Sequence, residues 1–279
     1  MIYIHNYLLA LVTENIRKDH DLKYYIVDAF TNSNFSGNPA GVCLLETPIQ
    51  DKLMQNIAAE NNLAETAFLL KQGEEYNLRW FTPEQEFDLC GHATLASAYV
   101  LFRFIEKDVN HLRFATQSGI LEVTRNETLL EMDFPSRPPR EIPVIELMRQ
   151  ALDMPVLEAY LSRDMMLILP TEKHVAQVNP DLNLVAEIPD CINLIVTAQG
   201  EQVDFVSRYF TPGISIPEDP VTGSAHSTLT PFWANRLGKK KLTAHQLSKR
   251  GGVLYCSDCG DRVKISGNAV LYLEGEIHL

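Results

Sequence analysis

Three short stretches of the sequence hold residues that could move protons. The first is "NNLAETAF", where Glu65 stands in an otherwise apolar neighbourhood. The second is "DLCGHAT", with Cys90 and His92, and the third is "PEDPVTGSAH", with Asp219 and Ser224. Carboxylates, imidazoles and thiols are the usual general acids, bases and nucleophiles of enzymes. The chain has no Walker loop, GxGxxG or HExxH motif, so proton transfer is the chemistry that we expect.

The second and third stretches each contain a small-residue turn that opens a predicted helix. Unpaired amides and the positive dipole end at such a turn suit a carboxylate or a phosphate, and glycine lets the ligand approach the backbone. Ordinary helix caps are the alternative interpretation. The candidate substrate-binding residues are Cys90, Gly91 and Ala93 in the first turn, and Thr222, Gly223 and Ser224 in the second.

The position of a titratable residue at a helix start predicts its charge. Cys90, beside a helix N-terminus, is expected to have a lowered pKa and to act as a proton-transfer thiolate. His92 lies in the first turn, where the helix dipole favours neutral imidazole. Asp219 lies just ahead of the second helix and could serve as a charge or as a cap.

The sequence also repeats itself. "RWFTPEQEFDLCGHATLASAYVL" begins at Arg79, and "RYFTPGISIPEDPVTGSAHSTLTPF" begins at Arg208. Each helix is followed by a strand opened by glycine, "QSGILEV" and then "RGGVLYC", so the landmarks keep their order and nearly constant separations. Internal duplication into two similar lobes is the simplest explanation.

The predicted elements alternate between strands and helices, which indicates an α+β protein. The helices are expected at 48–62, 92–105 and 224–238, the last interrupted by Pro231. We predict an N-terminal extension at 1–20, a first lobe at 21–134 and a second lobe at 135–267, joined by the proline-rich segment 134–143. The segment 268–279 is a candidate last strand of the first lobe.

Composition and charge narrow the class of partner. The 279 residues carry a formal net charge of -12, which repels nucleic acids and anionic membrane surfaces. No apolar run approaches the length of a membrane span, and the short apolar segment 7–12 lacks the flanks of a secretion signal. Five cysteines without framework spacing predict reduced thiols and a cytoplasmic protein. The single CxxC, formed by Cys256 and Cys259, supplies too few ligands for a tetrahedral metal site, so we expect no bound metal.

Taken together, the motifs resemble those of the phenazine-biosynthesis PhzF-like family in the diaminopimelate epimerase fold group. The resemblance is carried by "VDAFTNSNFSGNPAGV", "NLAETAF", "RWFTPEQEFDLCGHATLASAYVL" and "EDPVTGSAHSTL", in the family's order, and covers about residues 22–275. It implies two lobes, each a mixed sheet or barrel around a central helix, with the active site between them. It also implies isomerisation without a cofactor, on a small carboxylate-bearing substrate that is amino-acid-like or cyclohexadienyl.

The resemblance assigns roles to particular residues. The family's acid/base glutamate falls on Glu65, its motif histidine on His92, and its aspartate and serine on Asp219 and Ser224. Epimerases of the fold group place one cysteine at each helix start. Here only Cys90 remains, because the second position is Thr222, whose hydroxyl is too weakly acidic for that role. We therefore expect proton shuttling by Glu65 rather than two-thiol racemisation.

Two other functions remain open at this stage. One is an amino-acid racemase or epimerase that uses Cys90 with a partner other than a thiol. The other is a ligand-binding or interaction module that kept the fold and lost its chemistry. A homodimer is the expected assembly, because homodimers are the commonest oligomers and occur often in this fold group.

Overall fold

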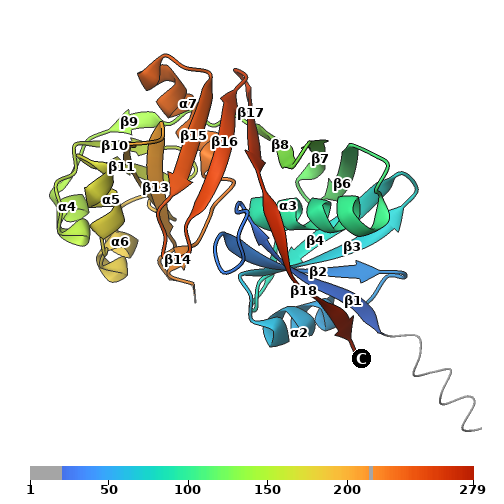
Figure 1. Ribbon diagram of the computed structural model, residues 1–279. Coiled ribbons are helices and arrows are strands. Elements are labelled where there is room, and N and C mark those ends of the chain that lie inside the picture. The colour runs from blue at the N-terminus through green and yellow to red at the C-terminus, as the bar shows by residue number, and fades with distance from the viewer. Residues whose placement is uncertain (1–20, 214–215) are drawn as a thin grey trace, which may run out of the picture.

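The computed structural model describes residues 21–213 and 216–279, and the predicted extension 1–20 lies outside them. The fold is a mixed α+β arrangement in two halves, each with one long central helix (Figure 1). The strands belong to a single hydrogen-bonded network that runs through both halves. The predicted α+β class with two similar lobes is confirmed.

The first lobe begins with a sheet that surrounds a central helix. Strand β1 pairs with β2, β2 runs parallel to β3, and β4 runs parallel to β6. The elements are β1 (Leu22–Ala29), β2 (Asn38–Leu45), α2 (Asp51–Asn61), β3 (Glu65–Gln72), β4 (Glu75–Phe81), β5 (Glu86–Phe87), α3 (Gly91–Val100), a π-helical turn (Leu101–Ile105), β6 (His111–Thr116), β7 (Gly119–Asn126) and β8 (Leu129–Pro135).

The second lobe follows the same plan, with shorter helices on its outer side (Figure 1). Its elements are β9 (Arg140–Ile142), α4 (Glu146–Leu152), β10 (Glu158–Leu161), β11 (Met165–Ile168), α5 (Glu172–Gln177), α6 (Leu182–Glu187), β12 (Leu194–Gln199), β13 (Phe205–Phe210), β14 (Glu218–Asp219), α7 (His226–Leu237), β15 (Lys241–Gln246), β16 (Gly252–Asp258) and β17 (Arg262–Gly267). The last strand of the chain is β18 (Ala269–Ile277).

The strand pairings repeat between the lobes. Strand β4 pairs antiparallel with β5 and parallel with β6, and β13 pairs antiparallel with β14 and parallel with β15. The repeated arginine makes the same two-pronged ion pair in both: Arg79 with Glu86 at 2.7 and 2.8 Å, and Arg208 with Glu218 at 2.6 and 2.9 Å. Internal duplication is therefore visible in the strand topology and in the repeated arginine–glutamate ion pair.

Two buried helices form the centre of the fold. Almost every residue of α3 is buried, as its apolar composition predicts. Helix α7 continues past Pro231, and its Trp233 stacks on Phe205 at 5.8 Å between ring centroids. Both helices contribute to one apolar core, in which Leu95 and Leu229 are fully buried.

Two late strands return to the first lobe. Strand β17 pairs antiparallel with β8, and β18 pairs antiparallel with β1 along nearly its whole length. Figure 1 shows β18 running from the second half of the molecule down to β1. The C-terminal strand therefore contributes to the sheet of the first lobe, although the proposed lobe boundaries themselves stay a prediction.

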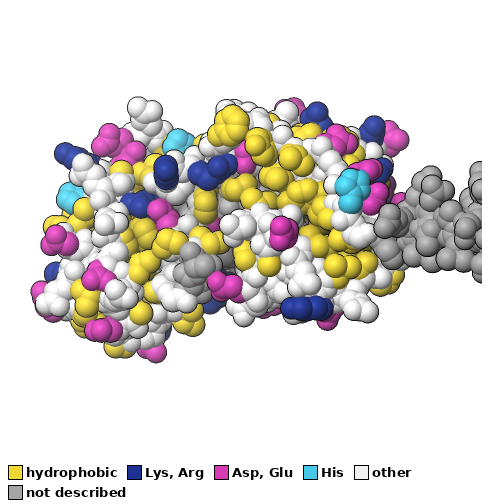
Figure 2. Space-filling model, turned by 90° about the horizontal axis from the view of Figure 1, so that it is seen from below, with side chains coloured by type: hydrophobic (Ala, Val, Ile, Leu, Met, Phe, Trp, Pro, Cys, Tyr) yellow, Lys and Arg dark blue, Asp and Glu magenta, His cyan; other side chains and the backbone are white. Residues whose placement is uncertain are grey.

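The molecular surface mixes apolar and charged side chains. On the face in Figure 2, hydrophobic side chains gather over the middle and charged groups of both signs lie around the margin. Within residues 21–213 and 216–279, no helix is both long enough and apolar enough to span a membrane.

The duplicated arginines allow a matched test of the two arginine–glutamate ion pairs. Arg208 is 13% exposed and also donates to the Val178 carbonyl at 2.6 Å, whereas Arg79 is 25% exposed and its further partner, Asp51, is mostly in solvent. We expect Arg208→Met to lower the free energy of unfolding by about 3 kcal/mol, and Arg79→Met by about 1 kcal/mol. Urea denaturation measures both, and an equal or smaller loss for Arg208→Met would contradict this ranking.

Candidate active site

The two central helices begin beside one another. The strand pairing β4–β5 delivers the chain to Cys90, which has extended backbone and directly precedes α3. A Cβ atom built on Gly91 would lie 3.2 Å from the Gly223 Cα, and one built on Gly223 would lie 3.4 Å from the Gly91 Cα. This backbone-to-backbone contact brings the two predicted small-residue turns together.

The second helix starts later than the sequence predicts. A tight turn over 223–225 comes first, with the His226 amide donating to the Gly223 carbonyl at 3.0 Å, and α7 then begins at His226. Burial lowers the pKa of His226 to about 4, so its ring is neutral. Because a carbonyl oxygen can only accept, the His226 Nδ1 donates to the Thr222 carbonyl at 2.9 Å. This hydrogen bond fixes the turn.

The first lobe supplies a glutamate, a histidine and a cysteine in one buried cluster. Glu65 is the first residue of β3, directly after the turn that ends α2, as the sequence predicts. The His92 Nε2 lies 3.1 Å from the Glu65 Oε2, and the His92 Nδ1 lies 3.5 Å from the Cys90 Sγ. His92 is 4% exposed and Cys90 is 6% exposed.

Both charge predictions for this cluster are wrong. Burial, reinforced by the nearby Glu65 carboxylate, raises the pKa of the Cys90 thiol, so the expected thiolate does not form readily. For His92, burial disfavours the charged ring, but the Cys90 sulfur, which accepts from Nδ1, and the Glu65 carboxylate outweigh it and raise the pKa of His92 well above its usual value. The burial and the specific neighbours set both pKa directions.

The contact between Glu65 and His92 is close but poorly directed. The Glu65 Oε2 and the His92 Nε2 are both buried, and neither has a well-aligned hydrogen-bond partner among the described residues. Catalytic hydrogen bonds often have this geometry before substrate arrives. The ligand atoms of Glu65, Cys90 and His92 also lie within 4.8 Å of one another, a set that could hold a soft divalent cation.

The second lobe supplies an aspartate held by three side chains. Asp219 accepts hydrogen bonds from Asn38 at 2.7 Å and from the Thr222 hydroxyl at 2.5 Å, and Gln246 donates to its backbone carbonyl at 2.7 Å. Burial raises the pKa of Asp219 to about 6; the His92 charge opposes that shift and Glu65 adds to it. The pKa of Asp219 in the second lobe therefore depends on the charges of His92 and Glu65 in the first.

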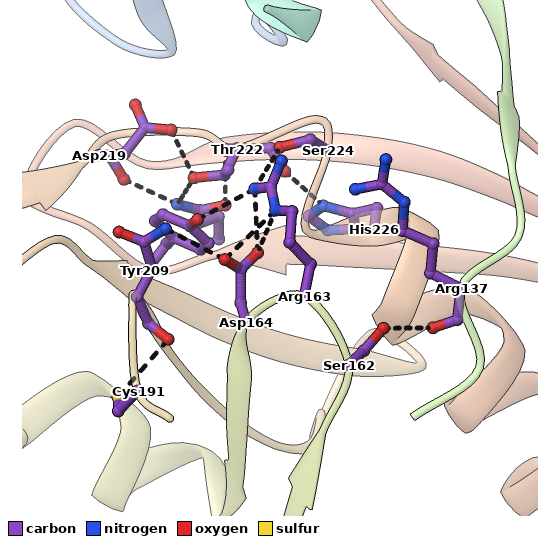
Figure 3. Close-up of polar contacts among 12 residues, drawn as sticks. Arg137, Ser162, Arg163, Asp164, Cys191, Tyr209, Asp219, Thr222, Ser224 and His226 are labelled. Atoms are coloured by element: carbon purple, nitrogen blue, oxygen red, sulfur yellow. Dashed lines mark hydrogen bonds and ion pairs between the residues drawn. The ribbon is translucent and has the colours of Figure 1, made fainter. Parts of the chain in front are cut away.

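Arg163 and Tyr209 extend the site beyond the predicted residues. The Arg163 Nη2 lies 3.4 Å from the Ser224 Oγ and 3.3 Å from the Tyr209 hydroxyl, and Figure 3 shows its guanidinium between Asp164 and Ser224. Sequence reasoning missed both residues, as it missed Gln246, since each reaches the site only through the fold. Asn38 lies in the "NFSGNPAGV" motif, which was a usable signal for it.

The structure thus brings most of the predicted residues to one place. Glu65, Cys90 and His92 form one cluster, Asp219 and Thr222 form a second, and Gly91 and Gly223 join them. Ser224 lies at the edge of the site, against Arg163. Ala93 differs, because its side chain is fully buried and its amide lies against the Cys90 sulfur.

The fold is of the diaminopimelate epimerase type, which solved epimerases share. A hydroxyproline epimerase from Agrobacterium vitis shares the fold with a TM-score of 0.63 at 10% identity, covering 94% of both chains. The model of the phenazine biosynthesis-like (PhzC-PhzF) family matches residues 27–275. The chain belongs to this family.

Relatives with higher identity agree with this placement. An uncharacterized isomerase of Pseudomonas aeruginosa is 48% identical over 259 residues, covering 92% of this chain and 99% of the relative. The crystal structure of a PhzF-family protein from Enterococcus faecalis matches with a TM-score of 0.92 and 48% identity, covering 93% of this chain and 100% of that one. An isomerase- or epimerase-type enzyme is the class that these relatives support.

The glycine contact at the centre of the site can be tested directly. A methyl group at Gly91 meets backbone at 3.2 Å, so the two helix starts must separate by a few tenths of an ångström. We expect Gly91→Ala to lower the free energy of unfolding by about 1–3 kcal/mol, as measured by thermal or urea denaturation. Gly275→Ala is the control, because its new methyl would meet only a Leu273 side-chain carbon at 3.7 Å. Wild-type stability for Gly91→Ala would contradict the tight contact.

Proposed function

We propose that the protein is a PhzF-like isomerase that moves a proton on a small carboxylate-bearing substrate, either amino-acid-like or cyclohexadienyl. The observation that carries this proposal is the convergence of Glu65, His92 and Asp219 where the two helix starts meet. Carboxyl and imidazole groups at such a point are suited to general acid/base chemistry. The reaction needs no electron carrier, because the substrate is neither oxidised nor reduced overall.

Glu65 is the proposed acid/base. Its carboxylate would take a proton from a substrate carbon, and the electron pair of the broken C–H bond would shift into the adjoining unsaturated system. The same carboxyl would then return the proton to another carbon on the same face, so that a double bond moves and the atoms balance. His92, charged and 3.1 Å away, would stabilise the Glu65 carboxylate before the proton is taken and again after it is returned.

The remaining groups would bind and polarise the substrate. The amides at the start of α3 and of the turn before α7 would stabilise negative charge that develops as the proton leaves. Asp219 would face a substrate amino or hydroxyl group, oriented by Asn38 and Thr222. The Thr222 hydroxyl already donates to Asp219, which speaks against Thr222 as a second proton donor in a racemase.

A deuterium-exchange experiment tests the role of Glu65. The protein would be incubated in D2O with a panel of amino-acid and cyclohexadienyl carboxylates, and carbon-bound deuterium would be followed by NMR. We expect wild type to exchange at one or two carbons, and Glu65→Gln to lose at least about a hundredfold in rate because the base is gone. Exchange that survives Glu65→Gln unchanged would overturn the proposal.

Cys90→Ala is the matched variant in the same cluster. Its thiol is buried with a raised pKa, so we expect Cys90→Ala to keep most of the exchange activity. Loss of exchange in Cys90→Ala together with tolerance of Glu65→Gln would instead support a cysteine-dependent racemase or epimerase.

The pH dependence of exchange tests Asp219. With a pKa of about 6, this carboxyl is charged above that pH and neutral below it. We expect the exchange rate to fall as the pH drops through about 6, because the neutral acid no longer balances a cationic substrate amino group. Asp219→Asn should lower the plateau by about tenfold or more and remove this inflection. An inflection near pH 6 that persists in Asp219→Asn would assign it to another group.

A further inference from the structure

Arg163 lies at the edge of the candidate active site, against Ser224. It belongs to the short connection between β10 and β11, and its Nη2 lies 3.4 Å from the Ser224 Oγ, next to the start of α7. The contact with Ser224 is exposed to solvent, and the Arg163 side chain is 39% exposed. A small molecule in the site could therefore reach this guanidinium.

A buried carboxylate holds the guanidinium in place. Asp164 is 2% exposed and accepts from the Arg163 Nε at 3.2 Å and from its Nη2 at 3.0 Å. Asn193 donates to the same carboxylate at 3.0 Å and keeps it oriented (Figure 3 draws Asp164 below Arg163). An arginine fixed in this way loses little conformational freedom when it binds an anion.

The guanidinium also keeps unused donors. Its bonds to the Tyr209 hydroxyl and to the Ser224 Oγ, at 3.3 and 3.4 Å, are longer than typical N–H···O bonds. Nη1 has no acceptor within bonding distance in the part of the chain that the structure describes. An arriving carboxylate could take these donors without breaking a strong bond.

The charges at the centre of the site also favour a cation at the position of Arg163. Glu65 and Asp219 place two carboxyl groups at the centre, and among the described residues His92 is the one cation that offsets them there. A substrate carboxylate would be repelled from that centre and needs a positive group away from it. Arg163 provides one beside Ser224, and its planar fork matches a carboxylate.

We infer that Arg163, together with the Ser224 hydroxyl, binds the carboxylate of the substrate and so selects for an anionic molecule. This inference rests on the proposed function, because it takes from there that the substrate carries a carboxylate. A purely structural role is the alternative, in which Arg163 only compensates the buried charge of Asp164.

The test measures binding rather than turnover, so it does not depend on the proposed reaction. Anthranilate and anthranilamide serve as probes, because they share a ring and an amino group and differ in the carboxylate. Dissociation constants would be measured by calorimetry or ligand-observed NMR for the full-length chain and for Arg163→Gln and Arg163→Lys. Arg149→Gln is the control, since Arg149 is an exposed arginine on α4 with a weak ion pair at 3.7 Å.

We expect wild type and Arg149→Gln to bind anthranilate at least about tenfold more tightly than anthranilamide. Arg163→Gln should remove this preference, and Arg163→Lys should keep part of it because the charge remains. The ratio of the two constants does not depend on the folded fraction, so lost stability alone cannot imitate the result. An unchanged ratio in Arg163→Gln, or no carboxylate preference in wild type, would overturn the inference.

The same probes separate this inference from the proposed function. Glu65→Gln should keep the preference for anthranilate while losing deuterium exchange, because its carboxyl group is not part of the anion contact. If exchange is absent in wild type but the Arg163-dependent preference is present, the proposed reaction fails and the binding site stands. If exchange depends on Glu65 but the preference ignores Arg163, the reaction stands and this inference fails.

Discussion

The contact between Gly91 and Gly223 determines where every other group of the site can lie. It joins the first turn of α3 to the turn before α7 at backbone distance, which a larger residue at either position would prevent. The starts of both helices consequently lie side by side, one from each lobe. His226, kept neutral by burial, fixes the second turn through the Thr222 carbonyl.

The two lobes share the ion pair that supports their strands but differ in the side chains at their helix starts. The arginine–glutamate ion pair is bidentate in both lobes. At the helix starts the lobes differ: Cys90 lies against His92, whereas Thr222 donates to Asp219. A symmetric scaffold therefore carries an asymmetric site, which suits a reaction whose proton leaves and returns by one group.

The sequence was sufficient for much of the fold and for the central residues of the site. The repeated motif and the buried character of 92–105 predicted both lobes and α3, and the motifs brought out Glu65, His92 and Asp219. The short helices α4, α5 and α6 were not predicted, because six or seven residues carry too little periodicity. The pKa direction predicted for Cys90 failed because burial, with the nearby Glu65, raises the pKa of its thiol. The direction predicted for His92 failed because Cys90 and Glu65 lie beside its ring. Arg163 has no local signal, since only the fold brings it to Ser224.

The position of β18 has a consequence for how the chain becomes folded during synthesis. Its pairing joins residues at opposite ends of the chain, with Leu22 opposite Ile277 and Ala29 opposite Ala269. Until β18 has left the ribosome, β1 presents one unpaired edge to its surroundings, and β8 likewise waits for β17. Pairings of such long sequence separation form late and slowly. Strand β1 is thus made long before its sheet is completed, and the nascent chain keeps an open strand edge until β18 has been synthesised.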